Sequence, residues 1–411
     1  MHQFLNVLIK LFNKVPVLFN QSMKRFVYPS LLVFHSVFLP LENDFKIVRY
    51  ICIILLFVYL SDKWRYFLNK KYNYINIWLL LFDIAVLFSS FHMVYIKLPA
   101  SFHAVSPFSG VLLILCVTGI FFFIEYLNEK RNVSAFLHMA YYLSVGYLCI
   151  NDVFLLRQMP SVSGKESTDI LYLLGNKFAV SYMHFFWLAL YYQNNIVKIE
   201  QGRLRELLFL SAHIVVTALI SYAVECSTAI VGISFMVIFL YCYKKMPWLY
   251  NPWGGLVLLL LFDTFFLFYE VVLDIPFIQY LIEDVLHEDL TLTGRTVIYA
   301  KMFDLIEDQP WFGYGNGTAT FFTQYYVNMP NTQNGLLNDY IDWGIVGVLL
   351  FVLLFYFVVK HIDYNSSRKN PFLCLLYTYI VLSSIEITLG LCFLAILPLS
   401  LFSDRKNVFP C

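Results

Sequence analysis

Gly294 and Arg295 begin a segment whose residue types could bind a phosphate. Residues 294–308 carry apolar side chains at helical spacing, which predicts a short amphipathic helix. The first turn of a helix has free N–H groups and the positive end of the helix dipole, and both favour an anion. Arginine there adds a fixed charge with bidentate geometry for phosphate. The alternative role for Arg295 is a surface ion pair with one of the nearby acids.

A glycine-rich strip, PWFGYGNG, follows this predicted helix. The helix should end before Pro310, because the residue preceding a proline disfavours helical geometry. Gly313 and Gly315 then stand between aromatic residues. Glycine allows positive φ or a close approach of the backbone to a ligand, so both are candidate substrate-binding positions.

A second polar strip, NTQNGLLNDYIDWGIVG, spans residues 331–347 and leads directly into an apolar run. Gln333, Asn334, Asn338 and Asp339 place amide and carboxylate groups at its edge. Such groups can bind sugar hydroxyls or phosphate oxygens. Helix capping and solvation are the alternative roles for each of them.

Four further polar residues lie at the ends of apolar segments. Asn176 and Lys177 precede one such segment, Glu225 lies in a tight bend between two others, and Glu386 lies in the last bend. Ionisable groups at the edge of an apolar region are candidates for function.

No metal or other cofactor is expected. Glu283 and Asp284 precede His287 at a helical spacing compatible with a metal, but further ligands are missing, and a solvated helix is the simpler interpretation. The eight cysteines are scattered without CxxC spacing, so neither a zinc site nor a disulfide framework is supported.

The elements that position these residues are predicted to be membrane spans. The chain is 60% hydrophobic and only 13% charged, with a mean hydropathy of +0.69, which is typical of integral membrane proteins. A span needs about 20 mostly apolar residues. We predict an all-α polytopic membrane protein with about twelve transmembrane helices, nine within 27–273 and three within 343–402. Their ranges are 27–41, 46–61, 76–97, 109–126, 134–156, 176–193, 207–223, 227–243, 252–273, 343–360, 371–386 and 388–402.

The distribution of lysine and arginine predicts the orientation. Most of these residues lie in segments between alternate spans, and the positive-inside rule then places both termini in the cytoplasm. Residues 1–26 are predicted to form a cytoplasmic or interfacial segment, and 403–411 a cytoplasmic tail. Residues 274–342 become one large extracytoplasmic loop containing short helices, on a face where ATP and nucleotide sugars are absent. The net charge of +1 and the lack of a basic block argue against a nucleic-acid partner.

Two motifs in this order resemble the Wzy-type polysaccharide polymerase and O-antigen ligase superfamily. The first is Gly-Arg opening an amphipathic helix, then Pro and Gly-x-Gly: here Gly294-Arg295, Pro310 and Gly313-Tyr314-Gly315. The second is a His-Asn-x-x-Leu-type strip running into a span with Gly-Ile-x-Gly: here Gln333-Asn334-Gly335-Leu336-Leu337 and Gly344-Ile345-Val346-Gly347.

The resemblance implies glycosyl transfer at the outer face of the bacterial cytoplasmic membrane. The superfamily joins sugars carried on undecaprenyl diphosphate, with inversion at the anomeric carbon and no required metal, in O-antigen, capsule or exopolysaccharide synthesis. Arg295 would neutralise charge that develops on the leaving diphosphate. A flippase and a chain-length regulator are implied as partners.

Two departures from the superfamily pattern concern charged groups. Its ligases have His where this chain has Gln333, and glutamine can orient a hydroxyl but cannot take its proton. Its ligases also carry Ser-Arg where this chain has Ser227-Thr228, so Lys177 is the candidate for a second cation. The candidates for the base are Glu225, Glu386 and His287.

A polymerase is the first functional interpretation, because the missing histidine counts against a ligase. The enzymatic alternative is a ligase that moves finished glycan from the lipid carrier to an acceptor. A transporter for a sugar or a lipid-linked oligosaccharide is the alternative from another class. Transporters commonly show two similar halves, and the loop at 274–342 has no counterpart in the first half.

Overall fold

A computed structural model describes residues 21–38, 46–67, 73–96, 106–157, 172–243, 245–267, 275–280, 295–329, 331–362 and 369–402. Over these residues the chain is helical and contains no named strand. An isolated bridge between Tyr172 and Gly175 is the β pairing found there. The prediction of an all-α fold is therefore confirmed for the described part of the chain.

Each of the twelve predicted spans overlaps a helix. These helices are α2 (Gln21–Val33) with the π-helical η2 (Phe34–Phe38), α3 (Lys46–Leu60), α5 (Asn73–His92), α6 (Phe108–Glu129), α7 (Val133–Leu156), α8 (Lys177–Glu200), α9 (Leu204–Ala223), α10 (Ser227–Cys242), α11 (Pro252–Leu267), α16 (Gly335–Lys360), α17 (Pro371–Ser383) and α18 (Leu391–Phe402). In the described part of the chain, five spans are long and apolar enough to cross a membrane: Tyr74–Tyr95, Phe108–Glu129, Val133–Leu156, Leu204–Ala223 and Gly335–Lys360. The chain thus has the helices of a membrane protein, and the total of twelve spans stays a prediction.

Six further helices in the described part of the chain lie between these. They are α4 (Trp64–Phe67), η4 (Met93–Tyr95), η6 (Pro247–Tyr250), α13 (Pro276–Tyr280), α14 (Arg295–Asp308) and α15 (Thr318–Val327). The bounds of α14 confirm the amphipathic helix predicted at 294–308. The helix α16 begins at Gly335, eight residues before the predicted span at 343–360, so most of the second polar strip lies in its first turns.

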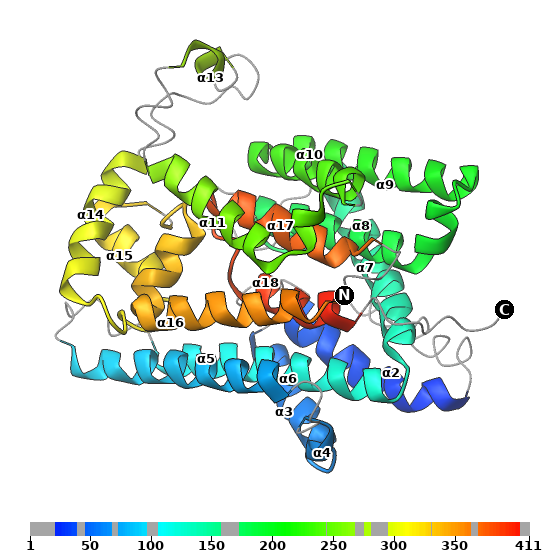
Figure 1. The fold of residues 1–411 in the computed structure, drawn as a ribbon, viewed down its shortest axis with the longest axis horizontal. Helices are drawn as coiled ribbons and strands as arrows, with labels where there is room; N and C mark the ends of the chain where they lie inside the picture. Colours follow the sequence, from blue (N-terminus) through cyan, green and yellow to red (C-terminus); the bar gives the residue numbers. More distant parts are fainter. Residues whose placement is uncertain are drawn as a thin grey trace.

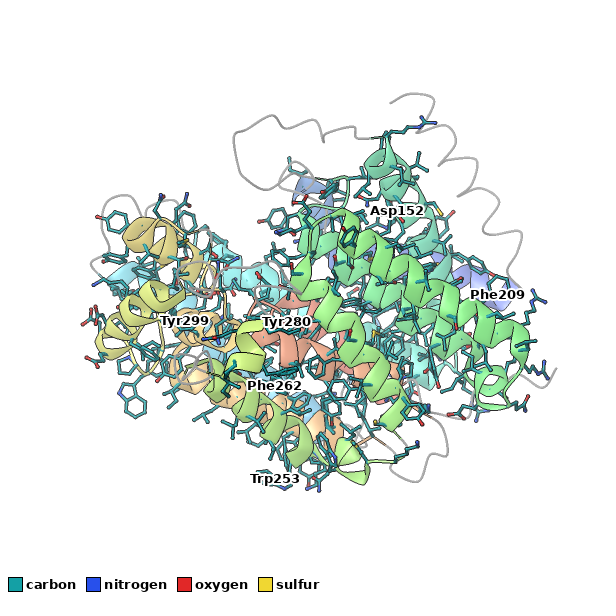
Figure 2. The ribbon with its side chains drawn as sticks, turned by 90° about the horizontal axis from the view of Figure 1, so that it is seen from above. Asp152, Phe209, Trp253, Phe262, Tyr280 and Tyr299 are labelled. Carbon is teal, nitrogen blue, oxygen red and sulfur yellow. The ribbon has the colours of Figure 1, made fainter. Side chains whose placement is uncertain are left out.

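The helices α14 and α15 gather with the start of α16 at one end of the molecule, on the left in Figure 1. We call this end the loop end. The helices α5 and α16 run side by side from it along the molecule (Figure 1). Seen from above, Tyr299 lies within the α14 and α15 group, whereas Phe209 on α9 lies on the opposite side (Figure 2).

A second hydrophobic core, separate from that of the helix bundle, holds the loop end together. It consists of Ile298, Tyr299, Met302, Leu305, Tyr314, Ala319, Phe322, Leu337 and Ile341. The helix α14 supplies the first four of these side chains, and three of them, Ile298, Met302 and Leu305, belong to its predicted apolar face. The buried Tyr314 hydroxyl donates to the Leu305 carbonyl oxygen at 3.1 Å. Burial, and then the nearby Asp308, raises the pKa of Tyr314 above its ordinary value, so the hydroxyl remains a neutral donor.

A break in α16 joins the two sequence motifs into one structural unit. Gly344 has φ 65° and ψ −175°, which interrupts the helix. The freed carbonyl oxygens of Ile341 and Asp342 accept from the N–H groups of Tyr314 and Gly315, both at 2.8 Å. The N–H groups of Ile345 and Val346 donate to the carbonyls of Pro310 and Trp311 at 2.9 and 3.1 Å. The strip 310–315 thereby satisfies the four backbone groups that the break exposes, as an apolar environment requires.

Asp342, beside the same break, holds the start of α15 in place. Its carboxylate accepts the backbone N–H groups of Gly317 and Ala319, each at 2.8 Å, and the Thr318 hydroxyl at 3.2 Å. Asp342 is 3% exposed. The N-cap residue of α15, Gly317, has no side chain to cap the helix, so Asp342 supplies the acceptor from a distant part of the chain.

Candidate functional site

A cavity of about 380 Å³ lies between η2, α8, α17 and α18, with Thr320 of α15 and Asn331 also in its wall. One part of its wall is aromatic and apolar, and includes Phe38, Phe178 and Phe186. The other part carries polar groups, from Asn176, Tyr182, Thr320, Asn331, Tyr379 and Glu386. Its size falls within the range of small-ligand sites. Among the sequence-predicted residues, Asn176 and Glu386 line it.

Glu386 is the only acidic or basic side chain among the described residues that line the cavity. It lies in the bend between α17 and α18 and is 6% exposed. The Asn331 side-chain amide donates to Glu386 Oε1 at 3.4 Å. A carboxylate in such a wall has the position and the chemistry of a proton acceptor.

A chain of contacts leads from α14 to Glu386 through the second polar strip. The Tyr299 hydroxyl, one turn after Arg295, donates to the Gln333 carbonyl oxygen at 3.5 Å. The Gln333 N–H in turn donates to Asn331 Oδ1 at 2.8 Å. Gln333 has φ 50°, so the strip turns sharply at this residue. The structure thus brings the start of α14 near the residue that holds Glu386.

The Asn334 side chain links the start of α16 to α11 and to the end of α17. Its Oδ1 accepts from the Leu337 N–H at 2.8 Å, which caps α16. Its Nδ2 donates to Asp263 Oδ1 on α11 and to the Ser384 carbonyl after α17, both at 3.4 Å. Asn334 is 2% exposed and does not line the cavity. In this structure it acts as a helix cap and interhelical contact.

Removing the Asn334 side chain should destabilise the loop end. Asn334→Ala loses the cap and the donor to the buried Asp263, which together are worth about 2–4 kcal/mol of unfolding free energy. The measurement is thermal unfolding of the purified protein in detergent. Asn132→Ala is the control, because the Asn132 side chain makes no capping bond to α7. Unfolding of Asn334→Ala at the wild-type temperature would contradict this account.

Asn338 and Asp339 are buried in the first turns of α16, with exposed fractions of 8% and 2%. Neither lines the cavity. One carboxylate oxygen of Asp339 has no hydrogen-bond partner, and the same is true of Asp263. No group of three potential metal ligands occurs in the described part of the chain.

The other candidates occupy different positions. Asn176 caps α8 by accepting the Ala179 N–H at 3.0 Å, and Lys177 Nζ lies 5.6 Å from the ring centroid of the cavity-lining Phe178. Glu225 is exposed in the bend between α9 and α10, with φ 54°, and does not line the cavity. His184, which lies deeper in α8, contacts Asp152 on α7 at 3.4 Å.

The first motif is described in part. Gly294 and His287 lie outside the described residues, and for Arg295 the structure gives the backbone at the start of α14. Gly313 and Gly315 face protein backbone and side chains. A Cβ on Gly313 would lie 2.5 Å from the Ile341 carbonyl oxygen, and one on Gly315 would lie 3.2 Å from the Ser90 Cα. Both have positive φ, at 64° and 101°. Their packing against other elements alone therefore requires glycine.

Residues 212–352 match the family model described as O-antigen ligase. They form an O-antigen ligase superfamily domain. Comparison with curated proteins and with solved structures gives no match. The match supports glycosyl transfer involving lipid-linked oligosaccharides as the class of chemistry, and it does not separate polymerase from ligase.

The superfamily domain contains α14, α15, the break in α16 and the strip with Asn331 and Gln333. Asn176, Lys177 and Glu386 lie outside the matched segment, so the cavity is built partly by the domain and partly by the rest of the chain.

The sequence did not indicate four polar residues of the cavity wall: Asn331, Thr320, Tyr182 and Tyr379. Asn331 is the first residue of the second polar strip, which could have indicated it. Tyr182 and Tyr379 stand inside apolar runs, where nothing distinguishes a cavity tyrosine from one that faces lipid.

Proposed function

We propose that the protein is a polysaccharide polymerase of the cytoplasmic membrane. It joins undecaprenyl-diphosphate-linked oligosaccharide repeat units on the outer face, with polyprenyl diphosphate as the leaving group. The observation that carries the proposal is the series of contacts from Tyr299 on α14 through Gln333 and Asn331 to Glu386. It connects the helix that Arg295 begins to a carboxylate in a cavity, as two-substrate glycosyl transfer requires.

Glu386 and Arg295 have separate roles in the reaction. A hydroxyl oxygen of the acceptor sugar bonds to the anomeric carbon of the donor, and Glu386 takes the hydroxyl proton. The bond between that carbon and the phosphate oxygen breaks, and its electron pair leaves with the diphosphate. Arg295, at the positive end of the α14 dipole, neutralises the charge on the leaving group. The energy is stored in the glycosyl phosphate, so the reaction uses no nucleotide.

Lys177 and Gln333 have supporting parts in this proposal. Lys177 lies beside Phe178 but outside the described cavity wall, and supplies the second positive charge for the diphosphate. Gln333 orients the acceptor hydroxyl, because a glutamine amide can donate and accept hydrogen bonds without taking a proton. A ligase is the second candidate, favoured by the description of the matching family model. The polymerase is preferred because Gln333 replaces the histidine expected in ligases.

Replacing Arg295 by lysine should largely abolish polymerisation. Lysine keeps the charge but loses the planar fork that binds two phosphate oxygens at once. Near-normal product length from Arg295→Lys would remove the claim of bidentate phosphate binding. Lys301→Arg is the control for a change of cation elsewhere on α14, because Lys301 pairs with the exposed Asp304 at 2.9 Å.

Glycan analysis of a deletion strain tests the function. The polymerase proposal expects single repeat units on the lipid carrier, with a ladder of lengths restored by the wild-type protein and not by Arg295→Ala. A ladder that accumulates on the lipid carrier would instead indicate a ligase. Repeat units that accumulate on the inner face would indicate a transporter. An unchanged ladder would overturn the proposed function.

A further inference from the structure

Resting on the proposed function, we infer that the cavity beside Glu386 is the acceptor subsite: it binds the neutral terminal sugar of a repeat unit, and Tyr182 positions that sugar. The donor diphosphate would then bind outside this cavity, toward the start of α14. Three features of the cavity wall carry the inference: its charge, its aromatic rings and the state of the Tyr182 hydroxyl.

The charge of the wall separates a sugar from a diphosphate. Among the described lining residues the charged group is the carboxylate of Glu386, and it is nine-tenths buried. An anionic diphosphate would lie beside this carboxylate, and the described lining residues include no lysine or arginine to balance it, in a setting where charge repulsion is weakly screened. Lys177 stands next to the lining residues and is not among them. A neutral sugar meets no such repulsion, and its hydroxyl is the group that a carboxylate can deprotonate.

The aromatic rings provide surfaces that suit a sugar ring. The rings of Tyr182 and Tyr379 lie 5.4 Å apart between centroids, at 56° to one another. On the apolar part of the wall, Phe38 and Phe186 stack at 4.6 Å and 5°. The C–H groups on the face of a sugar ring pack favourably on the electron-rich face of an aromatic ring. The wall therefore combines packed aromatic side chains with one carboxylate among its described residues, a composition that suits a sugar better than an anion.

The Tyr182 hydroxyl needs a partner that an occupant could supply. Its oxygen is buried and has no hydrogen-bond partner in the described structure. The neighbouring Tyr379 hydroxyl, in contrast, donates to the Tyr182 carbonyl at 3.5 Å. Buried polar groups are nearly always paired, so an unpaired hydroxyl on a cavity wall marks the place where a ligand hydroxyl binds. This hydroxyl would fix which sugar hydroxyl faces Glu386.

The test measures sugar and diphosphate binding separately, on the purified full-length protein in detergent. The sugar probe is the free repeat oligosaccharide, released from the organism's own lipid-linked glycan, observed by saturation-transfer NMR. The diphosphate probe is farnesyl diphosphate. Tyr182→Phe should raise the Kd for the oligosaccharide roughly tenfold, because one buried hydrogen bond is lost. The same substitution should leave the Kd for farnesyl diphosphate unchanged. Tyr325→Phe, on the exposed face of α15, is the matched control and should change neither constant.

Three outcomes would overturn the inference: equal oligosaccharide affinity in Tyr182→Phe and Tyr325→Phe, weakened farnesyl diphosphate binding in Tyr182→Phe, or no oligosaccharide binding by the wild type. Unfolding temperatures of the variants show whether each is folded. These results are distinguishable from failure of the proposed function, because that failure is read from the deletion strain. If the strain needs the protein to make its ladder but Tyr182→Phe binds the oligosaccharide as tightly as the wild type, the acceptor subsite is wrong and the proposed function stands.

Discussion

Glu386→Gln is expected to lower the rate of glycan joining by about a hundredfold to ten-thousandfold, the usual contribution of a general base. Glutamine keeps the size of the side chain and can still accept from Asn331, so the cavity should keep its shape. It cannot take the proton of the acceptor hydroxyl. The measurement is the rate of chain extension by purified protein. Because the sugar subsite is intact, oligosaccharide binding by this variant should stay close to that of the wild type.

Two Glu→Gln substitutions serve as controls for this prediction. Glu307 is exposed on α14, and Glu307→Gln should extend chains at the wild-type rate. Glu225 was an equal candidate for the base from the sequence, but it is exposed and lies outside the cavity wall. We therefore expect Glu225→Gln to retain activity. Loss of activity in Glu225→Gln together with retention in Glu386→Gln would reverse the assignment of the base.

Gly344→Ala is expected to cause the largest loss of stability. An alanine at φ 65° costs about 1–3 kcal/mol of backbone strain. Its Cβ would also lie 2.4 Å from the carbonyl carbon and oxygen of Trp311, a contact that forces the strip 310–315 away from α16. The four backbone hydrogen bonds between the strip and α16 would weaken as a result, at about 0.5–1.5 kcal/mol each. A loss of several kcal/mol should leave little folded protein in the membrane.

The measurement for Gly344→Ala is the amount of protein in the membrane and its unfolding temperature in detergent. Gly146→Ala in α7 is the matched control, because a Cβ there meets nothing within 4 Å. Alanine is favoured over glycine inside a helix, so this control should be neutral or slightly stabilising. Wild-type stability of Gly344→Ala would show that the break in α16 does not depend on glycine.

The elements were largely predictable from the sequence, because they depend on local patterns. The apolar spacing of residues 294–308 and the position of Pro310 set the bounds of α14, and apolar runs marked the helices of the bundle. The helix α16 begins before the predicted span at 343–360, in a stretch where polar residues such as Asn338 and Asp339 suggested a loop. They are buried inside the helix instead, where tertiary contacts outweigh their polarity.

The break in α16 could not be predicted, because its determinants are far apart in the chain. Gly344 disrupts the helix only because residues 310–315 satisfy the exposed backbone groups, and neither segment indicates its partner. The cap of α15 by Asp342 has the same character. Glycines that the sequence offered as substrate-binding positions thus have packing reasons of their own, and their part in binding stays a proposal.

Of the residues that the sequence indicated for the site, Asn176 and Glu386 line the cavity, whereas Lys177, Glu225 and Asn334 do not. Glu386 stood out because a carboxylate between two apolar runs is unusual. For Asn334 and Asn176 the alternative of helix capping describes what their side chains do here. The cavity itself arises from five separated segments, and so the roles of Asn331, Tyr182 and Tyr379 required the three-dimensional structure.

Reconstitution of the purified protein in liposomes tests the central claim most directly. The substrate is the undecaprenyl-diphosphate-linked repeat unit, and both glycan length and released undecaprenyl diphosphate are measured. The account predicts a ladder of lengths, one released diphosphate carrier for each new linkage, and neither product from Glu386→Gln or Arg295→Ala. Folded wild-type protein that forms no linkage between repeat units, or a Glu386→Gln variant that makes the same ladder, would contradict it.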